Sequence, residues 1–208
     1  MPKQPQRKPQ VEEKKKYDFR KHNPYRMILW FGLFGISSLF VGLVSAFLMS
    51  NVGDWQALRP PKAFLASTLI LGASSFTMAG AKKAFRMEDR RQFRWMVIGT
   101  ALLGVAFLVS QTIGWYDLKN SGINIRQSIG GSYLYLISGM HAMHILAGMG
   151  FFGWFMAKAL RNTDHIGTAL FYFTDPNRKL QLDLMAIYWH FMDGIWLFLM
   201  IVFLWQFL

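Results

Sequence analysis

The sequence has 208 residues, of which 53% are hydrophobic and 16% are aromatic, and its formal net charge is +12. It contains no cysteine, which excludes disulfides, iron–sulfur clusters, covalently attached haem and thiolate-bound metals. The basic residues lie between long apolar blocks, a distribution that argues against a nucleic-acid partner and favours a membrane protein.

Residues 1–26 form a polar segment ahead of the first apolar block. They hold nine Lys or Arg side chains against three acids, together with Pro2, Pro5 and Pro9. This composition is typical of a solvated segment without a packed core. We predict a flexible cytoplasmic tail near anionic lipid headgroups. It is not a cleaved signal, because the apolar run that follows is too long.

Five apolar blocks follow, each long enough to cross about 30 Å of hydrocarbon as a helix. A segment in lipid must satisfy its own backbone hydrogen bonds, so each block is predicted to be an α-helix and the fold class all-α. The predicted spans cover residues 27–49, 63–81, 95–116, 131–157 and 184–208. Residues 27–208 are therefore predicted to form one polytopic membrane domain, a bundle of five transmembrane helices.

The Lys and Arg side chains outside the spans are divided unequally between the two sides of the membrane. Nineteen fall in the tail and in the loops after the second and fourth spans, against four in the other two loops. Because cytoplasmic loops carry the excess of basic residues, we predict a cytoplasmic N-terminus and a periplasmic C-terminus. Small residues cluster in the second and fourth spans, where they permit close helix contacts within this chain or with a partner.

A few ionisable side chains fall inside the predicted spans, where an unpaired charge costs at least about 2.5 kcal/mol. They are His141 and His144 in the fourth span and His190 and Asp193 in the fifth. Each pair is three residues apart and shares a helix face. At a rise of about 1.5 Å per residue, His144 and Asp193 lie at a similar depth and could form a hydrogen bond. We predict a structural network between these helices, with Gln111 as a further member.

Other functions of these side chains compete with a structural network. Three histidines and a carboxylate could hold a metal, and histidines on facing helices could ligate haem. No open catalytic position or second acidic cluster accompanies them, however. Asp193 could relay protons, although a single carboxylate is a poor conduit across a bilayer. The sequence shows no phosphate-binding glycine loop or nucleophile elbow, so we predict no catalytic, metal-binding or cofactor-binding residue.

Two segments in the last two spans carry a resemblance to a known family. Gly139 to His144 has the pattern G-x-H-x-x-H, and Trp189 to Trp196 has the pattern W-H-F-x-D-x-x-W. Together, in this order and on the last two of five helices, they resemble subunit III of the haem–copper terminal oxidases, the cytochrome c oxidase subunit III family. The resemblance covers about residues 25–208.

The resemblance implies a non-catalytic subunit of a proton-translocating, oxygen-reducing oxidase in a bacterial plasma membrane. Subunit I would be its direct partner and would hold the haems and copper, with subunit II and other respiratory-complex subunits nearby. Its expected roles are to steady the catalytic subunit, to support proton uptake and to bind structural phospholipids. The matching subunit of a quinol oxidase is the alternative, and a free-standing transporter or a haem-binding membrane protein is a different class.

The sequence departs from the family pattern in three places. Longer members have seven helices, and this chain is similar to the short bacterial type that lacks the first two. Many relatives have a membrane-buried glutamate in the equivalent of the first span, but residues 27–49 contain no acid. A glutamate that often follows three residues after the third-span glutamine is here Gly114.

Overall fold

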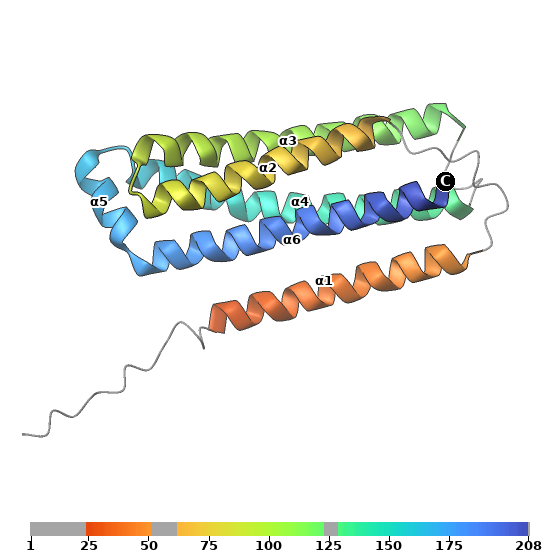
Figure 1. The fold of residues 1–208 in the computed structure, drawn as a ribbon, viewed down its shortest axis with the longest axis horizontal. Coiled ribbons are helices and arrows are strands. Elements are labelled where there is room, and N and C mark those ends of the chain that lie inside the picture. Colours follow the sequence, from red (N-terminus) through yellow and green to blue (C-terminus); the bar gives the residue numbers. More distant parts are fainter. Residues whose placement is uncertain (1–23, 51–61, 123–128, 208) are drawn as a thin grey trace, which may run out of the picture.

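The computed structural model describes residues 24–50, 62–122 and 129–207 (Figure 1). Its helices are α1 (Pro24–Met49), α2 (Lys62–Arg86), α3 (Arg90–Asn120), α4 (Ile129–Asn162), α5 (Ile166–Thr174) and α6 (Pro176–Phe207). These ranges contain no strand. All helices except α5 are long and apolar enough to cross a membrane. This confirms the predicted all-α fold with five spans. The predicted tail, apart from residues 24–26, lies outside the described residues.

The long helices extend beyond the apolar spans that the sequence predicts. α3, for example, has 31 residues and a length of about 46 Å, although the apolar span covers residues 95–116 only. Hydropathy marks the part of a helix that lies in hydrocarbon, whereas helical hydrogen bonds continue into the polar ends. The short helix α5 was not predicted, because nine residues are too few to give a membrane-spanning signal.

A tight turn joins α2 to α3 and makes them an antiparallel hairpin. Glu88 adopts the left-handed conformation with φ 55°, and the Asp89 N–H donates to the Ala84 carbonyl at 3.0 Å. The Asp89 side chain then caps α3 by accepting a hydrogen bond of 2.9 Å from the Gln92 N–H. Such caps satisfy amide groups that a helix start leaves unpaired.

The helix α6 is the centre of the bundle. It contacts α1, α2, α4 and α5, and half of its apolar window is buried. Trp189 and Trp196, both fully buried, belong to two separate hydrophobic clusters, with Trp189 in the one nearer α5. In Figure 1, α1 runs alongside α6 at the edge of the bundle, and α5 lies across one end.

The basic residues gather at the end of the bundle that carries α5. There α1, α3 and α6 begin and α2 and α4 end (Figure 1). The cations of these segments are Arg26, Lys82, Lys83, Arg86, Arg90, Arg91, Arg94, Lys158, Arg161, Arg178 and Lys179. At the other end, the described segments supply Lys62 and Lys119. The predicted topology therefore brings the basic segments together, and the side of the membrane on which they lie stays a prediction.

Candidate functional site

A line of cross-helix contacts, which we call the α2–α6 seam, holds the two tryptophans of the W-H-F-x-D-x-x-W motif. Trp196 Nε1 donates to Thr68 Oγ1 at 3.2 Å. Trp189 Nε1 donates to Ser74 Oγ at 2.6 Å, and both of these side chains are buried. The two indoles thus fill the core and at the same time fix the register between α2 and α6.

Two more contacts continue the seam toward the basic end. Ser75 Oγ lies 2.6 Å from His190 Nδ1, so a hydrogen bond joins the two side chains. Further along, Lys82 Nζ forms an ion pair of 3.0 Å with Asp183 Oδ1. From Thr68–Trp196 to Lys82–Asp183, the contacts ascend α2 and descend α6, as the antiparallel packing of the two helices requires.

Asp193 lies on the same seam and is 5% exposed. The Ser75 hydroxyl is within reach of its carboxyl group. Neither carboxyl oxygen, however, has a well-aligned hydrogen bond with a described residue. A carboxyl group without a firm partner is expensive to bury, which makes Asp193 the least satisfied polar side chain of the seam.

His141 is fully buried inside a cage of aromatic rings. Its ring centroid lies 6.0 Å from Phe40, 5.7 Å from Phe107 and 5.2 Å from Trp196. Neither ring nitrogen has a hydrogen-bond partner among the described residues. The imidazole therefore serves mainly as a flat ring that joins α1, α3, α4 and α6.

The predicted hydrogen bond between His144 and Asp193 is wrong. His144 Nδ1 instead pairs with the Met140 carbonyl of its own helix at 2.8 Å. The link from α4 to α6 at this level comes from Tyr188, whose hydroxyl donates to the His144 carbonyl at 2.8 Å. The five predicted residues thus do not form one hydrogen-bonded network.

Gln111 forms a different link, between α3 and α2. Its side chain is fully buried, and Nε2 donates to Ser67 Oγ at 3.1 Å. Ser67 in turn donates to Ser110 Oγ at 3.0 Å. Sequence analysis missed these hydroxyl partners, because serine in an apolar run resembles a packing residue.

Gly139, the first residue of the other motif, is half-buried, and a Cβ atom added there would meet no atom within 4 Å. No group of three or more His, Cys, Asp or Glu side chains that could hold a metal ion occurs in the described part of the chain.

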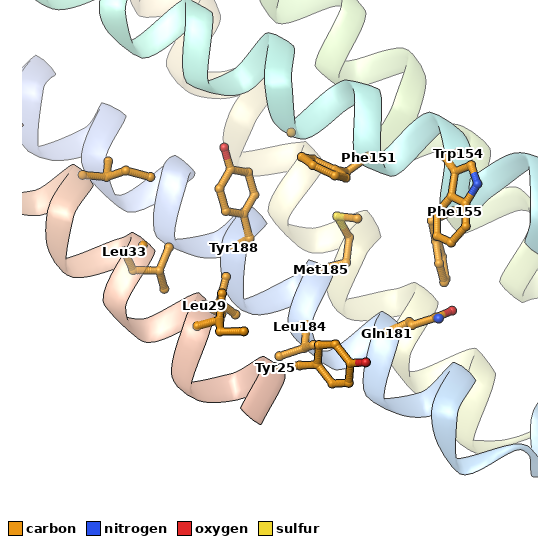
Figure 2. Close-up of a pocket in the computed structure, with 14 residues that line it drawn as sticks. Tyr25, Leu29, Leu33, Phe151, Trp154, Phe155, Gln181, Leu184, Met185 and Tyr188 are labelled. Carbon is orange, nitrogen blue, oxygen red and sulfur yellow. The ribbon is translucent and has the colours of Figure 1, made fainter. Parts of the chain in front are cut away.

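An apolar groove of about 470 Å³ lies between the first half of α1 and the helices α4 and α6 (Figure 2). The second half of α1 buries Phe40, Val44 and Phe47, whereas the first half buries only Leu33. Near the basic end, Tyr25 and Gln181 contribute polar groups to the lining.

Two cationic side chains contact residues that line the groove at its basic end. Lys158 Nζ lies 5.2 Å from the ring centroid of Trp154, which lines the groove. Arg178 Nη1 donates to Gln181 Oε1 at 3.0 Å. The groove is thus apolar along its length and basic at one mouth.

The short helix α5 attaches to the basic end through aromatic contacts. Tyr172 is 4% exposed and lies against Phe85 and Phe93. Burial raises the pKa of Tyr172 to about 12, and the nearby Arg178 opposes this effect only in part.

Comparison with known proteins gives matches along most of the chain. The family described as cytochrome c oxidase subunit III matches residues 27–207. A probable cytochrome c oxidase subunit 3 of Mycobacterium leprae is 35% identical over 169 residues, which cover 78% of each protein. Cytochrome c oxidase subunit 3 of Corynebacterium diphtheriae is 28% identical over 171 residues, again 78% of each protein. The chicken (Gallus gallus) protein of that name is 28% identical over 193 residues, 87% of this chain and 68% of the relative.

Proposed function

This chain belongs to the cytochrome c oxidase subunit III family, and we propose that it acts as the non-catalytic subunit III of a haem–copper oxidase. In this function it lies directly against subunit I, which holds the haems and the copper, and close to subunit II. It steadies the catalytic subunit and supports proton uptake. The relatives' names supply cytochrome c as the proposed electron donor of the complex.

The observation that carries this proposal is the use of the motif side chains to join helices. Trp189 and Trp196 donate hydrogen bonds to α2, and His190 pairs with Ser75. His141 packs among rings from three other helices. Side chains that brace a bundle in this way suit a subunit that gives its partner a rigid surface.

The proposed location is a bacterial plasma membrane, with the basic N-terminal segment in the cytoplasm, the five long helices across the membrane and a periplasmic C-terminus. The gathering of Lys and Arg at the α5 end supports this orientation, because basic residues favour the cytoplasmic side. The same basic surface would also attract anionic lipids on the cytoplasmic side.

We assign the apolar groove beside α1 to the acyl chains of a structural phospholipid. Its lining is apolar, and Lys158 and Arg178 lie at one mouth, where a phosphate group could pair with them. The residues that line this lipid site all come from α1, α4 and α6, so the site lies within the five-helix bundle. It does not require the first two helices of the longer family members.

Purification of the tagged chain in mild detergent from its membrane tests the proposed function. We expect a haem–copper subunit to copurify in equal amount, with its haem absorbance in the visible spectrum. Mass spectrometry of the extracted lipid should find phospholipid in a fixed ratio to the protein. A chain that purifies alone, or one that carries haem absorbance without a second subunit, would contradict the proposal.

A further inference from the structure

The outer side of the α2–α6 seam presents a small polar patch within an apolar surface. Gly72, Ser75 and Ala79 repeat at helical spacing along α2, and His190, Gly194 and Leu197 do so along α6. The hydrogen bond between Ser75 and His190 brings the two rows together. We call this surface the seam face: Gly72, Ser75, Ala79, His190, Gly194 and Leu197.

The imidazole of His190 lies at a depth where lipid offers no hydrogen bond. His190 is six residues beyond Leu184, where the predicted apolar span of α6 starts, which puts it about 9 Å along the axis from that end of the span. Nδ1 is used by Ser75, and the ring is half-buried. Within the described ranges, Nε2 has no hydrogen-bond partner. A polar group left against acyl chains is costly, and such side chains almost always face protein or water.

Asp193, one turn further along α6, competes with His190 for the Ser75 hydroxyl from inside the seam. Its carboxyl group is more than nine-tenths buried and lacks a well-aligned partner among the described residues. Ser75, which lies within reach of both Asp193 and His190, has a single hydroxyl to share between them. The site therefore has more hydrogen-bonding groups than this chain satisfies.

The residues around His190 leave room for a close neighbour. Gly72, Ala79 and Gly194 are exposed, and a Cβ atom added at either glycine would meet no atom within 4 Å. Small residues at a membrane surface let a second helix approach closely enough for its side chains to form hydrogen bonds. An acyl chain could fill the same space, but it could not pair with His190 Nε2.

We propose that the seam face is the docking surface for a transmembrane helix of the haem-bearing catalytic subunit, whose polar side chain forms a hydrogen bond with His190 Nε2. This inference rests on the proposed function, which supplies the partner. It adds the face of the bundle that the partner covers and the side chain that anchors the contact.

Photocrosslinking in the intact complex tests where the partner lies. Leu197 of the seam face and Leu102 of α3 are both exposed leucines, and each is replaced in turn by p-benzoyl-phenylalanine. We expect irradiation to link the Leu197 position to the catalytic subunit with at least a several-fold higher yield than the Leu102 position. An equal or lower yield at Leu197, or crosslinks from it to lipid alone, overturns the proposal.

Substitution of His190 tests the anchoring contact. His190→Leu should reduce the fraction of catalytic subunit that stays bound during detergent washing several-fold, and His190→Gln, which keeps a hydrogen-bonding group, should restore much of it. Thr77→Val is the matched control, because it removes the 2.9 Å hydrogen bond to Thr100 between α2 and α3 but lies outside the seam face. If Thr77→Val releases the partner as strongly as His190→Leu does, the release reflects a weakened bundle and the proposal fails.

The two experiments separate this inference from the proposed function. If the catalytic subunit copurifies but the crosslinks come from α3, the docking face is wrong and the function stands. If no catalytic subunit copurifies with the unchanged protein, the proposed function itself fails. The helical circular dichroism of each variant confirms that the bundle is still folded.

Discussion

Trp189 Nε1 donates a hydrogen bond of 2.6 Å to Ser74 Oγ, and both side chains are buried between α2 and α6. Interhelical hydrogen bonds in membranes contribute about 0.6 kcal/mol on average and up to about 1.7 kcal/mol. Ser74→Ala should therefore lower the free energy of unfolding in detergent by about 1 kcal/mol. Ser38→Ala is the control, because Ser38 is exposed and bonds only to its own helix. An equal loss in both variants would contradict the role of the seam.

Asp193 is predicted to act through hydrogen bonding rather than as a reactive acid. Asp193→Asn should keep the assembly and its thermal stability largely intact, because an amide of the same shape can still pair with Ser75. Asp193→Leu should weaken both, by about 1 kcal/mol in stability. Melting curves in detergent measure the difference, and equal tolerance of the two substitutions would refute this role.

Gly114 packs directly against the buried ring of Phe64, and a Cβ atom at this position would overlap that ring. Gly114→Ala should therefore destabilise the protein by about 1–3 kcal/mol, as overpacking of a core does. Gly139→Ala is the matched control, because a Cβ there meets no atom within 4 Å. Thermal melting of both variants should separate them clearly, and a Gly114 variant as stable as the Gly139 variant would show that Phe64 can move aside.

The raised pKa of Tyr172 predicts a loss of stability in alkali. The phenol of the unfolded chain releases its proton near pH 10, whereas burial holds the pKa in the folded chain at about 12. Above pH 10 the unfolded state binds fewer protons than the folded state, so the free energy of unfolding falls as the pH rises through this window. Across this pH window the free energy of unfolding falls by at most about 2.7 kcal/mol because of Tyr172.

Tyr172→Phe removes the titrating group and keeps the packing against Phe85 and Phe93. Melting temperatures measured between pH 9 and pH 11 should fall less steeply for this variant than for the unchanged protein. Parallel curves for the two proteins would mean that another group causes the alkaline loss.

The number and type of helices could be predicted because lipid permits few alternatives. The uncharged run of residues 27–49, for example, has to satisfy its own backbone in hydrocarbon, and it forms α1. The helix ends and the short helix α5 could not be predicted in the same way. Their residues lie outside the apolar runs, and their positions depend on caps such as Asp89 and on aromatic contacts such as those of Tyr172.

The sequence shows which polar side chains lie inside the spans, but it does not show which groups they pair with. Spacing along a helix gives the depth of His144 and Asp193, but it does not give the rotation of each helix about its axis. His144 pairs with its own helix, and Asp193 lies within reach of Ser75 on α2.

The serine and threonine partners also gave no signal in the sequence. Thr68, which accepts the Trp196 hydrogen bond, also bonds to the Phe64 carbonyl of its own helix. A hydroxyl of this kind fits an apolar run without a visible interruption of hydropathy, so only the packed structure reveals that it joins two helices.

The central position of α6 has a consequence for how the protein is made. The ribosome delivers α6 after the other helices, so α1 and α4 enter the membrane before the neighbour on which they pack. A nascent chain that stops before Pro176 could close the α2–α3 hairpin but would leave Ser74 and Thr68 without their indole donors. Delivery of α6 is thus the step that completes the bundle, and chains truncated ahead of it should be targets for membrane proteases.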